Sequence, residues 1–349
     1  MNYFTLIIGI AFTSILVVDL ILTSFGFNAK APISSRFRSG FWKIILKISG
    51  NRGTSSLLKY AGPLTITFWL LGWLLLVWAG NSIILLSDPS SVVESGTLHT
   101  TEFWPKVYFT GYTLSTLGSG EYIPYGTGWQ IFSAFISFSG FMLITIAISY
   151  LLQVTSSVTD KRTLASRIYC LGSSPEGIIN NLKTDDGYDN LIDHLNDFTE
   201  DVHSLAHKHI AYPILHNFHD PNPNASLEIN LSRLDEALTL FYLSKECTDH
   251  SACCLQPLRN AISHFLETLH KAFIQKAENV PMPPHQGKVL QHGIAVQVND
   301  YNQPKLEERR KLLAGWLHNQ GWQWNDLFEE NEAQLDIWLP KSNEKEQTK

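Results

Sequence analysis

The sequence predicts an all-α membrane protein whose second half is soluble and mostly helical. Three apolar runs, each long enough to cross a bilayer, lie within residues 1–159. Those residues carry eight Lys/Arg and five Asp/Glu, whereas residues 160–349 carry 18 Lys/Arg and 27 Asp/Glu. Twelve of the 13 histidines also lie in the second part. The overall mean hydropathy of -0.02 therefore averages two unlike halves.

The first apolar run is Phe4–Phe27, which contains one acid, Asp19. As a helix it would be about 36 Å long, enough to span a bilayer. A cleaved signal peptide is the alternative, but Met1-Asn2-Tyr3 lacks the Lys or Arg of such a leader. We therefore expect a retained span in which Asp19 has a polar partner.

The second run, Leu64–Leu86, follows Pro63, and the third, Trp129–Gln153, follows Gly126-Thr127-Gly128. Between the first two runs, residues 28–62 contain seven Lys/Arg and no acid. The positive-inside rule places this linker and the C-terminal half in the cytoplasm. The N-terminus and residues 87–128 are then outside, as in a multi-pass protein of a bacterial-type plasma (inner) membrane.

Within the basic linker, Phe41–Ile48 has the pattern of a short amphipathic helix. Its lysines and aromatic residues suit a helix that lies flat at the inner membrane surface. An ordinary cytoplasmic helix fits the pattern as well, so both interpretations stay open.

The segment between the second and third runs, residues 105–124, is too short and too polar for another full span. About 11 residues after Pro105 could form a helix of about 16 Å, half a bilayer. The glycine-containing stretch Thr116-Leu117-Gly118-Ser119-Gly120 follows. A half-helix and an extended segment predict a re-entrant loop, which must be buried in protein or line water.

This segment resembles the pore loop of the tetrameric potassium channel superfamily, in the type with two pore-forming helices per subunit. The family's filter, Thr-Val-Gly-Tyr-Gly followed by Asp, corresponds to Thr116-Leu117-Gly118-Ser119-Gly120 followed by Glu121. Pro124 and Gly140 stand where the family has a proline and the hinge glycine of its inner helix. The resemblance covers roughly residues 60–156, with an additional N-terminal helix and an unrecognised cytoplasmic domain.

The resemblance implies a homotetramer in the lipid bilayer, with K⁺ ions held by backbone carbonyls and the Thr116 hydroxyl. Gly118 and Gly120 would supply positive φ, and Glu121 would sit at the filter mouth. Gly140 would be the hinge. The cavity and a hydrophobic gate would be lined by Ile144, Ile148 and Leu152, which are spaced four residues apart.

Two positions depart from the family pattern. Leu117 replaces a β-branched residue that packs behind the filter, and Ser119 replaces an aromatic that normally keeps the filter at one diameter. A looser filter would admit Na⁺, whereas hydrogen bonds of Ser119 could hold it. We favour a potassium channel over a non-selective monovalent cation channel. A membrane-anchored receptor or effector with a non-conducting pore-like region is the alternative from another class.

The soluble half predicts helices but no identifiable ligand. It lacks a glycine-rich phosphate loop, and its excess of acids argues against nucleic-acid binding. We expect no enzyme activity and no organic cofactor, because no nucleophile–base arrangement is evident. The domain is expected to regulate or assemble the pore, with an unknown cytoplasmic ligand or partner possible.

Two clusters of metal-ligating residue types are candidate metal sites. His203 and His207 share a helix face, and Cys247, His250 and Cys253 lie close in sequence. Their ligand types suit Zn²⁺, but surface histidines and buried thiols explain both clusters more simply.

The predicted organisation has five parts. They are an N-terminal span (1–28), a basic cytoplasmic linker (29–62), a pore domain (63–158), a helical cytoplasmic domain (159–340) and a polar tail (341–349).

Overall fold

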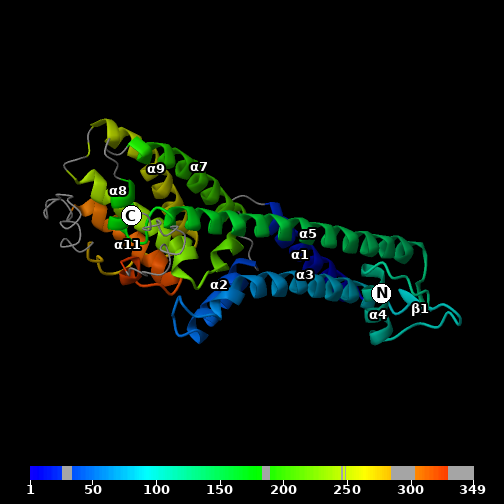
Figure 1. The fold of residues 1–349 in the computed structure, drawn as a ribbon. Coiled ribbons are helices and arrows are strands. Elements are labelled where there is room, and N and C mark those ends of the chain that lie inside the picture. The colour runs from blue at the N-terminus through cyan, green and yellow to red at the C-terminus, as the bar shows by residue number, and fades with distance from the viewer. Residues whose placement is uncertain (26–33, 183–188, 245–246, 248, 284–302, 329–349) are drawn as a thin grey trace, which may run out of the picture.

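The computed structural model describes residues 1–25, 34–182, 189–244, 247, 249–283 and 303–328. Three of its helices are long and apolar enough to cross a membrane: α1 (Tyr3–Phe25), α3 (Ala61–Leu86) and α5 (Thr127–Tyr169). They lie side by side on the right of Figure 1, and the soluble half lies on the left. The predicted class, three spans joined to a helical domain, is confirmed.

Helices α1 and α3 pack closely through glycines. A Cβ at Gly9 would lie 2.7 Å from the Ile84 side chain, and one at Gly80 would lie 2.4 Å from the Thr13 hydroxyl. Small residues of this kind let two helix backbones approach within a membrane. The Asn2 N–H donates to the Ser87 carbonyl, so the N-terminus lies at the same end of the molecule as the segment that follows α3.

That segment contains a short helix and a small ladder. Helix α4 (Phe103–Leu114) is too short to span a bilayer, as the sequence predicts for a half-helix. Strand β1 (Val92–Glu94) pairs antiparallel with β2 (Tyr122–Pro124). The ladder was not predicted, because strands of three residues are too short to show an alternating pattern.

Helix α5 is much longer than the predicted Trp129–Gln153. Its 43 residues would extend about 65 Å, more than twice the hydrocarbon core. The apolar run ends at Gln153, but no Pro or Gly interrupts the sequence before Gly172. The helix therefore continues into the soluble half, and the expected boundary between residues 158 and 159 falls inside it.

The basic linker is folded against both halves. Helix α2 (Ser34–Ile48) begins before the predicted Phe41, and a 3₁₀ turn, η1 (Leu58–Tyr60), leads into α3. The Phe37 ring lies 5.2 Å from Trp69 of α3. On another face of α2, Trp42 is buried and its Nε1–H donates to the Asn319 carbonyl at 3.1 Å.

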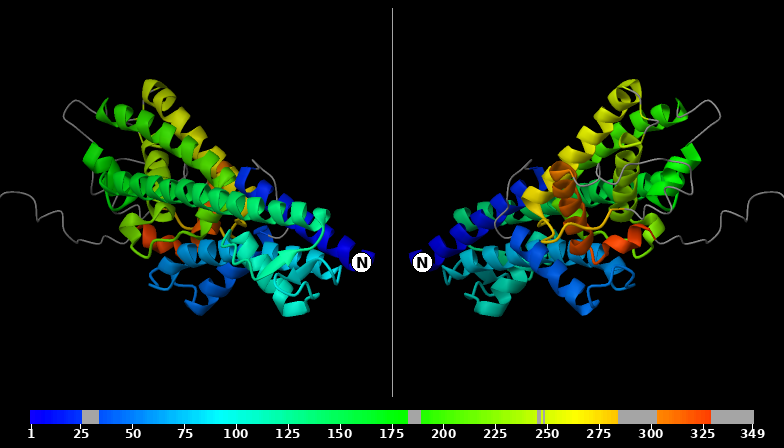
Figure 2. Two further views of the ribbon diagram at one scale, coloured as in Figure 1. Left: turned by 90° about the vertical axis from the view of Figure 1, so that its right-hand side faces the viewer. Right: turned by 90° about the vertical axis from the view of Figure 1, so that its left-hand side faces the viewer.

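The soluble half is built around α8 (Leu227–Tyr242), in which every residue from Leu227 to Phe241 is buried. Figure 2 shows α7 (Asp189–Ala211) and α9 (Asp249–Ala272) as a neighbouring pair. The other described elements are α6 (Pro175–Leu182), α11 (Pro304–Asn319), η2 (Pro213–Asn217), η3 (Pro223–Ala225) and η5 (Trp324–Leu327).

The buried charges of α8 are paired with other helices. Asp235 accepts hydrogen bonds from Arg259 of α9 and Arg309 of α11. Glu236 accepts from Arg310 at 2.9 and 3.0 Å, in a two-point contact. Because a buried charge is costly without a partner, these pairs fix α8, α9 and α11 in one arrangement.

Candidate functional site

The backbone after α4 has an unusual conformation. Thr116, Gly118 and Gly120 have φ of 60°, 63° and 77°, so positive φ recurs at every second residue. Glycine adopts such angles without cost, whereas Thr116 stores strain of about 1–2 kcal/mol. Alternating the sign of φ turns successive carbonyls towards one side of the chain, which is the requirement for a row of cation ligands.

This segment lies open in a single subunit. Residues 115–121 are exposed, and Leu117, which was expected to pack behind the filter, keeps 70% of its surface accessible. Glu121 is also exposed, and its carbonyl accepts a hydrogen bond from the Ser95 N–H at 2.9 Å. The outer end of the segment is thus attached to the β1–β2 ladder.

The half-helix α4 is fixed by polar contacts with α3. The Lys106 ammonium is buried and donates to the carbonyls of Leu85, Asp88 and Pro89 at the end of α3. Trp78 donates to the Val107 carbonyl at 2.9 Å. Because Lys106 donates to the last turn of α3 and to the residues that follow it, the two helices keep one relative position.

Gly140 marks the contact between the long helix and the end of α4. A Cβ on Gly140 would lie only 1.9 Å from the Leu114 carbonyl oxygen. A glycine is therefore needed for close packing at this point, whatever hinge motion it also allows. Ile144, Ile148 and Leu152 follow on an accessible face of α5, with 51%, 55% and 65% of their surfaces exposed.

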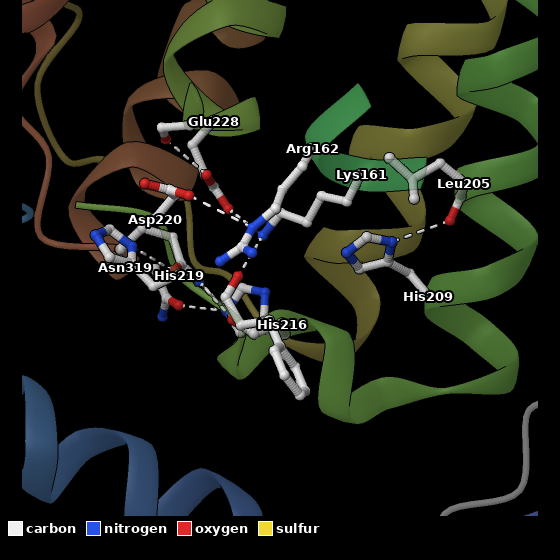
Figure 3. A network of polar contacts seen from close by, with 12 residues as sticks. Lys161, Arg162, Leu205, His209, His216, His219, Asp220, Glu228 and Asn319 are labelled. Atoms are coloured by element: carbon white, nitrogen blue, oxygen red, sulfur yellow. Dashed lines mark hydrogen bonds and ion pairs between the residues drawn. The ribbon is translucent and has the colours of Figure 1, made fainter. Parts of the chain in front are cut away.

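Near its C-terminal end α5 is joined to the soluble half by a buried ion pair (Figure 3). The Lys161 ammonium lies 2.7 Å from Glu228 Oε1 and 2.8 Å from the Phe218 carbonyl. Burial alone would raise the pKa of Glu228, but the adjacent Lys161 charge lowers it to about 2. Glu228 is therefore charged near neutral pH, and its contact with the Lys161 ammonium ties α5 to α8.

The basic linker contacts the same region through two histidines. His219 Nε2 donates to the Gly53 carbonyl at 2.7 Å, and His216 Nε2 lies 2.5 Å from Asn319 Oδ1. Burial lowers the pKa of His216 to about 4 and also lowers that of His219. Both are therefore neutral at pH 7. They join the linker, η2 and the end of α11, next to the Lys161–Glu228 pair.

Comparison with known proteins agrees with this geometry. Residues 64–157 match a protein family described as "Ion channel". The match begins in α3, includes α4 and the glycine-containing segment, and ends in α5. The chain belongs to the ion channel family.

Over almost its whole length the chain is also related to the uncharacterized membrane protein YdjJ of Bacillus subtilis (strain 168). The two are 30% identical over 329 residues, which cover 93% of this chain and 96% of that protein. No solved structure matches this chain significantly.

In this ion channel protein Gly140 lies against the end of α4, just before the candidate filter segment, whereas the candidate metal ligands do not come together. The His203 and His207 rings both approach His264 of α9, with centroids 6.2 and 6.1 Å apart. Cys253 is exposed and Cys247 is half-buried, while the side chain of His250 lies outside the described residues. Within the described part of the chain, no group of three His, Cys, Asp or Glu is placed to hold a metal ion.

The residues that join the channel module to the soluble half were missed by sequence reasoning. Lys161 and Glu228 are 67 positions apart, and nothing in their spacing indicates a pair. The sequence gives no signal for the burial of Glu228, because Glu228, Ser232 and Asp235 recur on one face of the helix. Such a polar face is typical of a helix whose one side faces solvent.

Proposed function

We propose that four copies of this chain form a cation channel that conducts K⁺ through a bacterial-type inner membrane. Each subunit would contribute Thr116, Leu117, Gly118, Ser119 and Gly120 to the selectivity filter, with K⁺ ions held between their carbonyls. The observation that carries the proposal is the alternation of positive φ in the segment that follows α4. A row of carbonyls facing one way is of little use to a single chain but surrounds an ion when four chains meet.

The electrostatics of the surrounding elements support a cation. The C-terminal end of α4 carries partial negative charge and points at the start of the segment. Glu121 would add negative charge at the mouth of the filter. Below it, Ile144, Ile148 and Leu152 would line the cavity, where four copies of an apolar face can close a pore by excluding water.

The proposed orientation follows from charge and from the common end of two segments. The seven Lys/Arg of residues 28–62 would face the cytoplasm. The N-terminus and the α3–α4 segment share the opposite end of the molecule and would face outward. The soluble half would then lie in the cytoplasm, below the pore.

The cytoplasmic domain is proposed to regulate the pore. It contacts the inner helix α5 at Lys161. It also contacts the first turn of α3 at Gly62, where a Cβ would lie 2.5 Å from the Phe218 ring. A rearrangement around residues 216–228 would therefore move α5 relative to α3. A cytoplasmic ligand or partner protein could supply the stimulus.

Reconstitution into liposomes tests the proposal. We expect K⁺ flux to exceed Na⁺ flux, and Gly118→Ala to abolish it, because alanine is strained at a φ of 63°. The control is Gly96→Ala, an outer-loop glycine with no strained φ and no neighbouring atom within 4 Å of a new Cβ. Equal K⁺ and Na⁺ fluxes would make the protein a non-selective cation channel. If neither ion moves and the protein in detergent is not tetrameric, a receptor or effector with a pore-like region is the better description.

A further inference from the structure

Two arginines share one carboxylate where α8, α9 and α11 meet. Arg309 of α11 holds Asp235 of α8 side-on, with Nε donating to Oδ2 at 2.7 Å and Nη2 to Oδ1 at 2.6 Å. Arg259 of α9 donates to the same Oδ1 at 3.1 Å through Nη1. The Asp235 side chain is completely buried, whereas those of Arg259 and Arg309 are 19% and 15% exposed. The carboxylate therefore lies inside, and the two guanidinium groups lie between it and solvent.

Arg259 has an edge that the described part of the chain does not use. Its Nη1 also donates to the Asp235 carbonyl at 3.0 Å and to the Thr239 hydroxyl at 2.8 Å, so the guanidinium is held in one orientation. Nε and Nη2 have no acceptor among the described residues. Neither is among the fully buried polar atoms that lack a partner, so solvent reaches both. These two N–H groups form a planar edge that binds a carboxylate or a phosphate through two parallel hydrogen bonds.

The surrounding charges favour an anion at this edge. The charges that act on Arg259 are those of Asp235 and Glu236 and of Arg309 and Arg310. Together with Arg259 these are three cations and two acids, a formal charge of +1. Burial lowers the pKa of Arg259, and the neighbouring Arg309 lowers it further, against the opposite effect of Asp235. A bound anion would offset both effects.

We propose that the free edge of Arg259 binds the phosphate group of a small cytoplasmic molecule. Lys305 would provide a further contact, since it is exposed and precedes Arg309 by one turn on the same face of α11. A phosphate has enough oxygens for the two N–H groups and for this ammonium, whereas a carboxylate has only two. The three helices lie in the soluble half, away from α1 and α3 (Figure 1), so the ligand would come from solution rather than from lipid.

Binding at this place would reach the pore through α8. Glu228, which holds Lys161 of α5, precedes Asp235 by about two turns of the same helix. An anion that joins α9 to α11 would fix the opposite end of α8 and so stabilise the arrangement in which α5 is held. This regulatory role rests on the proposed channel function, whereas the binding itself does not.

Thermal unfolding of the full chain in detergent measures the binding. Sodium phosphate near neutral pH should raise the Tm in a saturable manner, beyond NaCl of equal ionic strength, and acetate should have less effect. Arg259→Lys keeps a cation beside Asp235 but lacks the planar edge, so its apparent Kd for phosphate should be at least about tenfold higher. The matched control is Arg167→Lys on α5, the same chemical change at an exposed ion pair, which should bind phosphate like wild type.

A second variant and a second probe complete the binding test. Lys305→Gln changes an exposed residue outside the ion pairs of Asp235 and should raise the Kd about threefold. Glycerol 3-phosphate distinguishes the sources of the phosphate group, because tighter binding than that of inorganic phosphate would assign an organic phosphate. Absence of a saturable shift in wild type would overturn the site. An unchanged Kd in Arg259→Lys would also overturn it, as would an unchanged Kd in Lys305→Gln if Arg259→Lys does not fold.

The flux assay separates the site from its regulatory role. Phosphate on the side of the soluble half should change the K⁺ flux of wild type at least about twofold and leave that of Arg259→Lys unchanged. A saturable thermal shift without any change in flux would overturn the regulatory role and keep the binding site. A saturable thermal shift in a protein that conducts no ion under any condition would instead reject the proposed channel function.

Discussion

The Lys161 ammonium lies 2.7 Å from Glu228 Oε1, and the two side chains are only 6% and 2% exposed. The pair connects the last turns of the long helix α5 with the first turn of the buried helix α8. Because a buried charge without its partner is strongly destabilising, each residue depends on the other. This contact is a direct connection between the soluble half and α5, the helix that carries the candidate gate.

We expect Lys161→Met to destabilise the protein by roughly 3–5 kcal/mol, since it leaves the Glu228 carboxylate buried without its cation. Thermal unfolding in detergent measures the loss. Adding Glu228→Gln should recover part of it, because the uncompensated charge is then removed. The control is Lys208→Met, which breaks the more exposed Lys208–Asp160 pair and should cost about 1 kcal/mol or less. Equal losses in the two single variants would contradict the assignment.

Gly140→Ala is expected to prevent correct packing of α4 against α5. The new methyl group would lie 1.9 Å from the Leu114 carbonyl oxygen, and backbone cannot rotate away as a side chain can. We expect loss of ion flux and a drop in the yield of assembled protein. Gly72→Ala on α3 provides the comparison, because a Cβ there meets nothing within 4 Å. Normal flux from Gly140→Ala would show that the close approach is not required.

The buried histidines predict loss of stability in acid. Burial lowers the pKa of His209 to about 3 and that of His216 to about 4, both below the ordinary value of 6.5. The unfolded chain therefore binds more protons between about pH 6.5 and 4, so stability falls as the pH falls through this window. From pH 7.5 to 5 each histidine should account for roughly 2 kcal/mol.

Chemical unfolding of the full chain in detergent at several pH values measures this effect. His209→Gln should weaken the dependence on pH, because its amide carries no titrating proton. The exposed His203→Gln should leave the dependence unchanged. An identical slope for His209→Gln and wild type would contradict the burial argument.

The basic linker should detach when Gly53 gains a side chain. A Cβ there would lie 2.4 Å from the Trp322 ring, while the Gly53 N–H donates to the Gly321 carbonyl at 2.7 Å. Overpacking of this kind costs roughly 1–3 kcal/mol, enough to raise the opened population about tenfold or more. We expect faster trypsin cleavage after Arg52 in Gly53→Ala. Gly40→Ala on α2, where a Cβ meets nothing within 4 Å, should be cleaved like wild type.

The spans and the half-helix could be predicted because their signals are local. Apolar runs such as Leu64–Leu86 are long, and Pro105 and Gly118 mark where the chain must turn. The full length of α5 could not be read from hydropathy, because the helix outlasts its apolar run by 16 residues, from Gln153 to Tyr169. The end of a membrane span and the end of a helix are set by different forces.

The contacts that support the candidate site were less accessible to sequence reasoning. Ser119 was recognised as a departure from the family pattern, but only the fold shows that the Tyr112 hydroxyl donates to the Tyr122 carbonyl at the far end of the segment. Lys161 follows the third apolar run in the sequence without a motif that singles it out. Its partner Glu228 depends on the course of the chain through η2 and η3, which contain little periodic pattern.

The complete burial of α8 has a consequence for biosynthesis. Asp235 and Glu236 leave the ribosome more than 70 residues before Arg309 and Arg310, which neutralise them in the finished domain. Until α11 is translated, Glu236 lacks its Arg310 partner and Asp235 has only Arg259, so α8 is an incompletely covered helix. The membrane helices are synthesised first, yet the soluble half that contacts them is complete only after α11 has been translated. Premature termination before residue 304 would therefore yield an inserted but unsupported chain, a natural substrate for membrane quality-control proteases.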